Sequence, residues 1–310
     1  MASNRQIKDP LISAIYYAPR GRMRLFALGK ELAQRYLYPT DLLIGIIGSA
    51  GVGKSTLIRG LFPGLELTND DEGINNRSTP IFHFSEEDFF SGHTFHLDTR
   101  YELAFHQHFE IVEAINKAIA SHRRVIVEHF DLIYQKLGYN AQVIFAIGED
   151  VRVYRPSVFG PSPSVIKRET EKNKIYRLMA HSAEDITCYI LQRDYGFEPN
   201  EVHSDVRHGF VIGFDAEPGI DIHELEKKVL DIIAQDLPIK PDKGPAILLA
   251  EHRIACTGKR IHVQSSGQIE HFRLVKNYTY DPISRQYLLV GIVGKARVFG
   301  FHELPPLDLR

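Results

Sequence analysis

The sequence predicts an α/β domain with a parallel sheet and flanking helices, followed by an α+β domain. Apolar runs at 42–48 and 141–148 alternate with helical patterns in the first half, which is typical of buried parallel strands. The segment RPSVFGPSPS at 155–164 holds three prolines and a glycine and interrupts this alternation. After it, helices and alternating strand-like segments follow in a segregated order. We therefore expect domains at 1–165 and 166–310.

The elements of the first domain follow from the spacing of apolar residues. Leucines and a tyrosine at helical spacing predict an opening helix over 24–37. The run at 42–48 ends in glycine and predicts a buried strand, and LELT at 65–68 predicts another. An apolar stripe predicts a helix over 101–121. The run VIVEHFDLIY, which follows Arg124, predicts a further strand that ends among acidic residues.

The second domain has a different order of elements. A helix at about 174–193 precedes the alternating segment VRHGFVIGFD, and DIHELEKKVLDIIAQDL has the pattern of a second helix. The segments AILLAEHRIA, RIHVQSS, EHFRLVKNYTY and RQYLLVGIVG then predict strands with polar turns between them.

Composition excludes several classes of protein. A chain of 310 residues is long enough for about two domains. With 44% hydrophobic and 25% charged residues it is neither disordered nor collagen-like, and a net charge of -2 excludes a globally basic nucleic-acid binder. Two cysteines make no disulfide framework, and no apolar run reaches membrane-spanning length. We expect a cytoplasmic protein that binds neither membranes nor DNA.

A phosphate-binding loop is the most specific motif of the chain. Gly48-Ser-Ala-Gly-Val-Gly53-Lys54-Ser55 fits G-x-x-x-x-G-K-[ST] and lies between a buried strand and the start of a helix. In such loops backbone N–H groups surround phosphate oxygens, the lysine reaches the β and γ phosphates, and the Ser hydroxyl binds Mg²⁺. The residues expected to bind a nucleoside triphosphate are Gly48, Ser49, Ala50, Gly51, Val52, Gly53, Lys54, Ser55 and Thr56.

Around this loop the sequence resembles the uridine kinase and phosphoribulokinase branch of P-loop kinases, over about 40–156. VIVEHFDLIY resembles the glutamate-bearing strand of that family, and NDDEG lies where the family has a catalytic aspartate. The resemblance implies a P-loop NTPase fold and a phosphotransferase that uses ATP with Mg²⁺. ATP is favoured over GTP because no N-K-x-D segment follows the second strand.

The resemblance also implies roles for residues beyond the loop. Its candidate catalytic carboxylates are Asp70, Asp71 and Glu128, and its candidate lid arginines for the nucleotide are Arg152 and Arg155. Two features depart from the family, because His129 replaces the glycine after the strand glutamate and the lid is rich in proline. Structural alternatives stay open for the acids: Asp70 as a turn residue, and Glu128 as the partner of a buried base.

A candidate metal site lies in the second domain. His181 and Asp185 are four residues apart in a helical segment, so they share one face of the helix. Cys256 and His262 flank a glycine turn before a strand-like segment. Together these four residues have the ligand types that Zn²⁺ accepts.

The stretch 174–298 resembles the editing domain of alanyl- and threonyl-tRNA synthetases, their second additional domain. HGFVIGFD, the helix after it and IHVQSSGQIEHFRLVK occur in the order of that family. The resemblance implies a zinc-dependent aminoacyl-tRNA hydrolase acting on the acceptor end. Here Asp185 replaces the second histidine of the helix, and the spacing C-x₅-H replaces C-x₃-H. The alternative is a non-catalytic, nucleotide-gated sensor whose second domain binds an amino acid, a nucleoside or a tRNA end.

Overall fold

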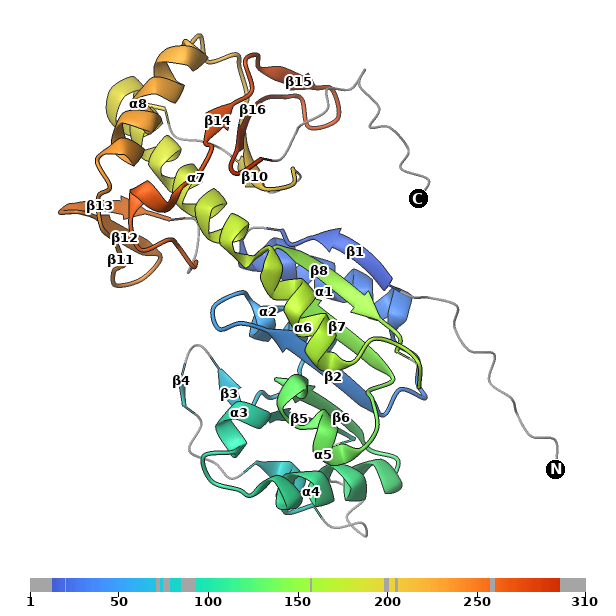
Figure 1. Cartoon of the computed structure of the whole chain (residues 1–310). Helices are drawn as coiled ribbons and strands as arrows, with labels where there is room; N and C mark the ends of the chain where they lie inside the picture. The colour runs from blue at the N-terminus through green and yellow to red at the C-terminus, as the bar shows by residue number, and fades with distance from the viewer. Residues whose placement is uncertain are drawn as a thin grey trace. The chain divides into compact units, whose positions relative to one another are not determined.

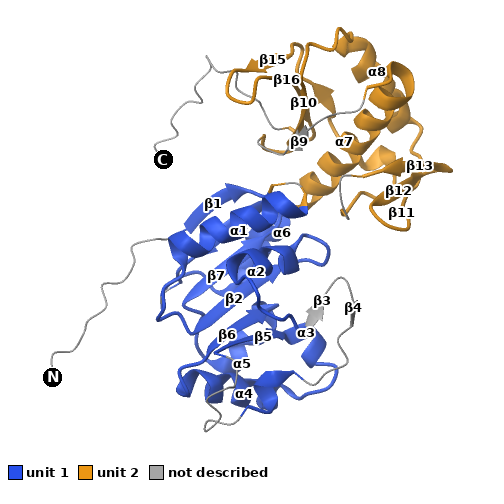
Figure 2. Ribbon diagram, turned by 180° about the vertical axis from the view of Figure 1, so that it is seen from behind, with its two compact units in different colours: residues 1–18, 22–173 blue, residues 19–21, 174–310 orange. Residues whose placement is uncertain are grey.

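The computed structural model describes residues 13–19, 21–70, 73–74, 79–84, 93–156, 158–197, 201–203, 206–256 and 260–295. They form two compact units, shown in different colours in Figure 2. Unit 1 comprises residues 1–18 and 22–173, and unit 2 comprises 19–21 and 174–310. The position 165/166, where the sequence predicts the domain boundary, lies within helix α6 (Pro163–Lys172) of unit 1.

Unit 1 is built on a mixed, six-stranded sheet. In spatial order its strands are β1 (Ser13–Tyr17), β8 (Asp150–Tyr154), β7 (Val143–Ile147), β2 (Leu43–Gly48), β6 (Arg124–Glu128) and β5 (Thr94–Asp98). The four strands from β7 to β5 are parallel, and all residues of β2 and β7 are buried, as expected for strands covered on both faces. The sheet is not wholly parallel, because β8 and β1 are antiparallel to their neighbours.

Helices cover both faces of this sheet. The remaining elements of unit 1 are α1 (Arg22–Tyr36), α2 (Lys54–Leu61), β3 (Asn69–Asp70), β4 (Gly73–Ile74), η1 (Pro80–Phe82), α3 (Thr99–Glu102), α4 (His108–Ala120), η2 (Phe130–Leu132) and α5 (Tyr134–Leu137). Helix α6 lies in front of the sheet in Figure 1, whereas α1 and α2 lie in front in Figure 2, which is seen from behind. Helices α1 and α2 pack closely because Gly29 and Gly60 meet: a Cβ on Gly60 would lie 2.3 Å from Phe26 O.

Two predicted elements of unit 1 differ from the structure. LELT at 65–68 is not a strand; the backbone N–H and hydroxyl of Thr68 bond to His96 of β5 instead of joining a ladder. The strand that extends the sheet beyond β6 is β5. The helix expected over 101–121 is interrupted between α3 and α4, where Gln107 and Glu110 form a capping box that begins α4 anew.

Unit 2 combines two long helices with antiparallel sheets. Its elements are α7 (Lys174–Tyr195), β9 (Glu201–His203), β10 (Gly209–Phe214), α8 (Ile222–Ala234), β11 (Ile239–Pro241), β12 (Ala246–Leu249), β13 (His252–Ala255), η3 (Ser266–Gln268), β14 (Arg273–Leu274), β15 (Thr279–Asp281) and β16 (Gln286–Ile292). One sheet has the order β14-β16-β10-β9 with β15 also on β16, and the other is β11-β12-β13. Apolar residues of α7, α8 and both sheets share one core.

The segment RIHVQSS is not a strand, although its residues alternate. Its backbone groups bond to side chains of α7: Val263 N donates to Ser182 Oγ at 3.1 Å, and Ile261 O accepts from His181 Nδ1 at 2.9 Å. These bonds hold the segment along α7, where it contributes to the candidate metal site.

Among the helices of the described residues, none combines the length and the apolar character needed to cross a bilayer.

Candidate functional site

The glycine-rich loop at 48–55 connects the carboxyl end of β2 to the first turn of α2, as the sequence predicts. Gly51 and Gly53 have φ values of 75° and 101°, a region in which residues with a Cβ are strained. A Cβ at Gly53 would also lie 2.5 Å from Leu25 Cδ2, so the Leu25 side chain would have to shift. The loop therefore depends on glycine for its backbone conformation.

Lys54 lies inside this loop and is buried. Its Nζ donates a hydrogen bond of 2.9 Å to Ser49 O and lies 3.3 Å from Glu128 Oε1. Glu128 is the last residue of β6, which pairs with β2 in parallel, so both residues lie at the same edge of the sheet. The structure thus brings together the lysine of the loop and one of the three predicted carboxylates.

His96 of β5 lies on the other side of Glu128. His96 Nδ1 accepts a 3.2 Å hydrogen bond from Thr68 N, so in the neutral ring Nε2 carries the proton. That nitrogen lies 3.5 Å from Glu128 Oε2 and has no hydrogen-bond partner among the described residues. Burial would raise the pKa of Glu128, but the contacts with His96 and Lys54 hold it below its ordinary value. Glu128 is therefore a buried carboxylate.

Asp98 and His129 complete a buried polar cluster around Glu128. Asp98 lies directly opposite Glu128 in the β5–β6 register, and its Oδ1 accepts hydrogen bonds from the first turn of α3. His129 follows Glu128 in the left-handed region with φ 56°, and its Nε2 lies 3.8 Å from Glu128 Oε1. Burial and the charge of Lys54 lower the pKa of His129. One ligand atom each from Asp98, Glu128 and His129 lie within 4.8 Å of one another.

The other residues of the loop surround Lys54. Gly48, Val52 and Ser55 are buried, Thr56 is half-buried, and Ala50 and Gly51 are exposed. Ser49 Oγ donates a hydrogen bond to Glu171 Oε1 of α6 at 3.4 Å.

Of the remaining acids and arginines predicted for this site, Asp70 and Arg152 lie on other strands. Asp70 lies in β3, where its backbone pairs with Gly73 of β4, and Asp71 lies outside the described residues. Arg152 lies on β8 and pairs with Asp150 of the same strand at 3.0 Å.

Arg155 lies at the opposite edge of the sheet. It follows β8, which runs antiparallel to β7, and it makes two hydrogen bonds to Asp41, of 2.9 and 2.7 Å, just before the start of β2. Its guanidinium also donates to Tyr36 O and lies over the ring of Tyr38. The contacts of Arg155 with Asp41 therefore connect the end of β8 to a residue just before β2.

His96 and Asp98 were not predicted to be site residues. The available signal was the segment TFHLD, a strand pattern that ends in an aspartate before a helix start. Its position beside β6 follows only from the pairing of β5 and β6.

The second predicted site lies within unit 2. Asp185 Oδ2 lies 2.8 Å from His262 Nε2 and accepts a hydrogen bond from Cys256 Sγ at 3.0 Å. These three residues offer ligand atoms within 4.8 Å of one another. His181 is adjacent, with its ring centroid 6.2 Å from that of His262. Since its Nδ1 donates to a carbonyl oxygen, its Nε2 holds the lone pair in the neutral ring.

A buried arginine balances part of the charge of this cluster. Arg260 NH1 lies 3.3 Å from Asp185 Oδ1 and also contacts Glu184. Burial would raise the pKa of Asp185, but His262 and Arg260 hold it below its ordinary value. Burial and the nearby Asp185 raise the pKa of the Cys256 thiol. Without a metal the thiol is protonated, so a metal that binds its sulfur must displace that proton.

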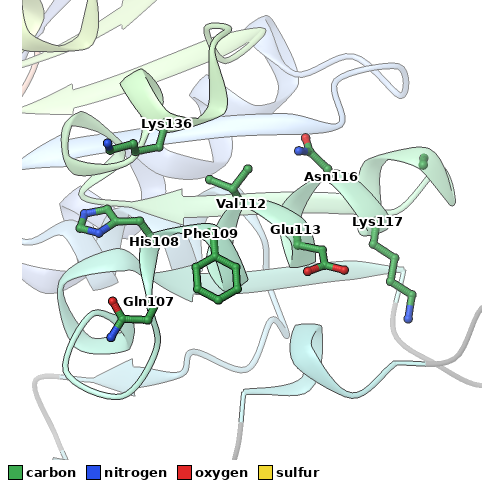
Figure 3. Close-up of a pocket in the computed structure, with 9 residues that line it drawn as sticks. Gln107, His108, Phe109, Val112, Glu113, Asn116, Lys117 and Lys136 are labelled. Carbon is green, nitrogen blue, oxygen red and sulfur yellow. The ribbon is translucent and has the colours of Figure 1, made fainter.

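A surface hollow of about 840 Å³ lies along α4 in unit 1, and no residue of the Glu128 cluster lines it. Figure 3 shows Phe109 and Val112 projecting from α4, with Lys136 of α5 beyond them. The glycine-rich loop contributes nothing to its lining, which consists of Gln107, His108, Phe109, Val112, Glu113, Asn116, Lys117, Ala120 and Lys136.

A comparison with models of known protein families finds no match for this chain, and a comparison with curated proteins finds none either.

Proposed function

We propose that unit 1 binds a nucleoside triphosphate, with ATP preferred, and transfers its terminal phosphoryl group to an acceptor. The observation that carries this proposal is the position of Lys54, which lies between the carbonyl oxygen of Ser49 in a glycine-rich loop and the carboxylate of Glu128. A lysine in such a loop supplies a positive charge to the β and γ phosphates. The neighbouring carboxylate at the sheet edge is suited to the Mg²⁺ that accompanies them.

Each group of the loop has a distinct role in this proposal. The backbone of residues 48–53 holds the phosphates, and Ser55 and Glu128 hold Mg²⁺, which neutralises charge as the phosphoryl group moves. Lys54 exchanges its contacts with Ser49 O and Glu128 for contacts with phosphate oxygens.

A nucleotide titration of the whole chain tests this proposal. Since ligand binding to the native state raises its stability, ATP with Mg²⁺ should raise the melting temperature of unit 1. Titration calorimetry should detect the binding directly. Lys54→Met should abolish both effects, whereas Lys136→Met, an exposed lysine on α5, should retain them. Equal ATP affinity in the Lys54→Met variant and the unaltered protein would refute the proposal.

For unit 2 we propose a Zn²⁺ site formed by Asp185, Cys256 and His262, with His181 as the fourth ligand. Support comes from the 4.8 Å grouping of the first three and from the hydrogen bond that leaves His181 Nε2 unprotonated. One carboxylate, one thiolate and two imidazoles form a ligand set that zinc accepts. A zinc ion there would activate a water molecule for hydrolysis of an aminoacyl ester at the end of a tRNA.

Metal analysis combined with a deacylation assay tests the proposal for unit 2. We expect about one zinc per chain and release of alanine or serine from the corresponding aminoacyl-tRNA. His262→Ala should lose both, and His252→Ala, which alters an exposed histidine of β13, should retain both. Stoichiometric zinc without deacylation would favour the alternative of a nucleotide-gated sensor over the hydrolase.

A further inference from the structure

We propose that Asp98, Glu128 and His129 bind a divalent transition-metal ion directly, that this site prefers Mn²⁺ to Mg²⁺, and that Lys54 competes with the ion. The inference deepens the function proposed for unit 1, because it assigns a metal preference to the same sheet edge. It does not require a nucleotide, so it can be tested without one.

The three ligands come from two adjacent parallel strands. Asp98 and Glu128 are the last residues of β5 and β6 and lie directly opposite each other in the register. His129 follows Glu128, and its Nε2 lies 3.8 Å from Glu128 Oε1. All three residues are buried, and their ligand atoms lie within 4.8 Å of one another. Two donor atoms about 2.1 Å from a shared ion lie 3 to 4 Å apart, so small side-chain adjustments would close the site.

One buried ring nitrogen at this cluster lacks a hydrogen-bond partner among the described residues, and a second ring beside it makes no hydrogen bond there. The ring of His129, with 9% of its side chain exposed, makes no hydrogen bond within the described part of the chain. His96 Nε2 is fully buried, faces Glu128 and also has no hydrogen-bond partner there. Buried polar groups are nearly always satisfied, so the buried N–H of His96 favours a small movement of Glu128 Oε2 toward it. In the proposed site a metal ion would bind the ring of His129, and the N–H of His96 would orient Glu128.

The backbone at His129 supports the same conclusion. A φ of 56° is uncommon for a residue other than glycine, and strain of this kind collects at functional sites. Glycine would adopt this conformation without strain but would offer no nitrogen. The imidazole is therefore present despite the backbone conformation, in a position where it reaches Glu128.

The donor set decides the preference between ions. Mg²⁺ strongly favours oxygen ligands and keeps several waters, whereas imidazole nitrogen suits transition metals. Two carboxylates and one imidazole therefore favour Mn²⁺ over Mg²⁺.

Lys54 competes with the ion for Glu128. Its ammonium lies 3.3 Å from Glu128 Oε1, the oxygen that also faces His129. An ion at this oxygen meets the repulsion of a buried positive charge. A nucleotide that attracts Lys54 removes this repulsion, so nucleotide and ion should strengthen each other's binding.

The test measures Mn²⁺ binding to the full chain by electron paramagnetic resonance, without nucleotide. His129→Gly removes the ring, and glycine adopts the positive φ of this position without strain. This variant should weaken Mn²⁺ binding by roughly tenfold or more. His122→Gly is a matched control, because His122 is exposed and has a φ of 54°. Asp98→Asn keeps a helix-capping side chain and should also weaken binding. Mg²⁺ should displace Mn²⁺ only at roughly tenfold excess or more.

Lys54→Met separates this inference from the proposed function. It should tighten Mn²⁺ binding by roughly tenfold while nucleotide binding is lost. Unchanged Mn²⁺ affinity in both His129→Gly and Asp98→Asn would overturn the inference. Loss of Mn²⁺ binding in His262→Ala instead would also overturn it. If ATP binds normally in those experiments, the proposed function stands although this inference fails.

Discussion

Replacing Arg155 tests whether this residue binds the nucleotide or stabilises the fold of unit 1. The resemblance to kinases predicts a lid arginine, whereas the structure pairs Arg155 with Asp41 at the amino end of β2. Only 10% of the Arg155 side chain and 4% of the Asp41 side chain are exposed. Replacing one partner of such a buried pair leaves an uncompensated charge and typically destabilises a protein by about 3–5 kcal/mol. For a domain of this size, that lowers the melting temperature by roughly 10 °C.

The effect of Arg155→Met on nucleotide binding should be small. The length of β2 separates Asp41 from the glycine-rich loop, at about 3.3 Å per residue or roughly 20 Å in total. Two unit charges at that distance in water interact by about 0.2 kcal/mol, before screening by salt. We therefore expect the ATP dissociation constant to change by less than about twofold.

Thermal unfolding and calorimetry of one preparation measure both quantities. Asp41→Asn combined with Arg155→Met should recover part of the lost stability, because the amide carries no charge and still accepts from Tyr38 N. If Arg155→Met weakened ATP binding tenfold at an unchanged melting temperature, Arg155 would contact the nucleotide. The conclusion that Arg155 stabilises the fold through Asp41 would then be refuted.

Three further substitutions test the packing and the charges. Gly60→Ala places a Cβ 2.3 Å from Phe26 O, so the urea midpoint should fall by the equivalent of about 1–3 kcal/mol; an unchanged midpoint would mean that α1 can move away. Burial raises the pKa of Glu102, so the contribution of Glu102 to stability is present at acid pH and is lost as the pH rises through that pKa. The stability of Glu102→Gln relative to the unaltered protein should therefore increase from pH 4 to pH 8, and parallel pH profiles of the two proteins would contradict this. Asp221 caps α8 by accepting from His223 N, and Asp221→Ala should destabilise unit 2 by about 1 kcal/mol, which a denaturant titration would detect.

The candidate sites were predictable to the extent that they depend on contiguous residues. The strand, the glycine-rich loop and the start of α2 follow one another in the sequence, so their order could be predicted from local patterns. His181 and Asp185 lie on one helix face because four residues make about one turn. His262 joins them through the segment 260–266, which bonds to α7 and has the alternating pattern of a strand, and Cys256 joins them by its own hydrogen bond to Asp185. The strand prediction for this segment was wrong, because its backbone bonds to α7 side chains at 261 and 263 and forms only an isolated bridge, Pro238 with Ser265, near its end.

The sequence by itself determined the glycine-rich loop, the i,i+4 pair of α7 and most of the helices and strands, because each depends on the spacing of neighbouring residues. Only the tertiary structure decided which residues surround Glu128. His96 and Asp98 reach it because β5 pairs with β6, and Arg155 is remote from the loop because β8 reverses direction beside β7. Strand pairing joins segments that are far apart in the chain, and its register and direction depend on the packing of both faces of the sheet, which no local pattern specifies.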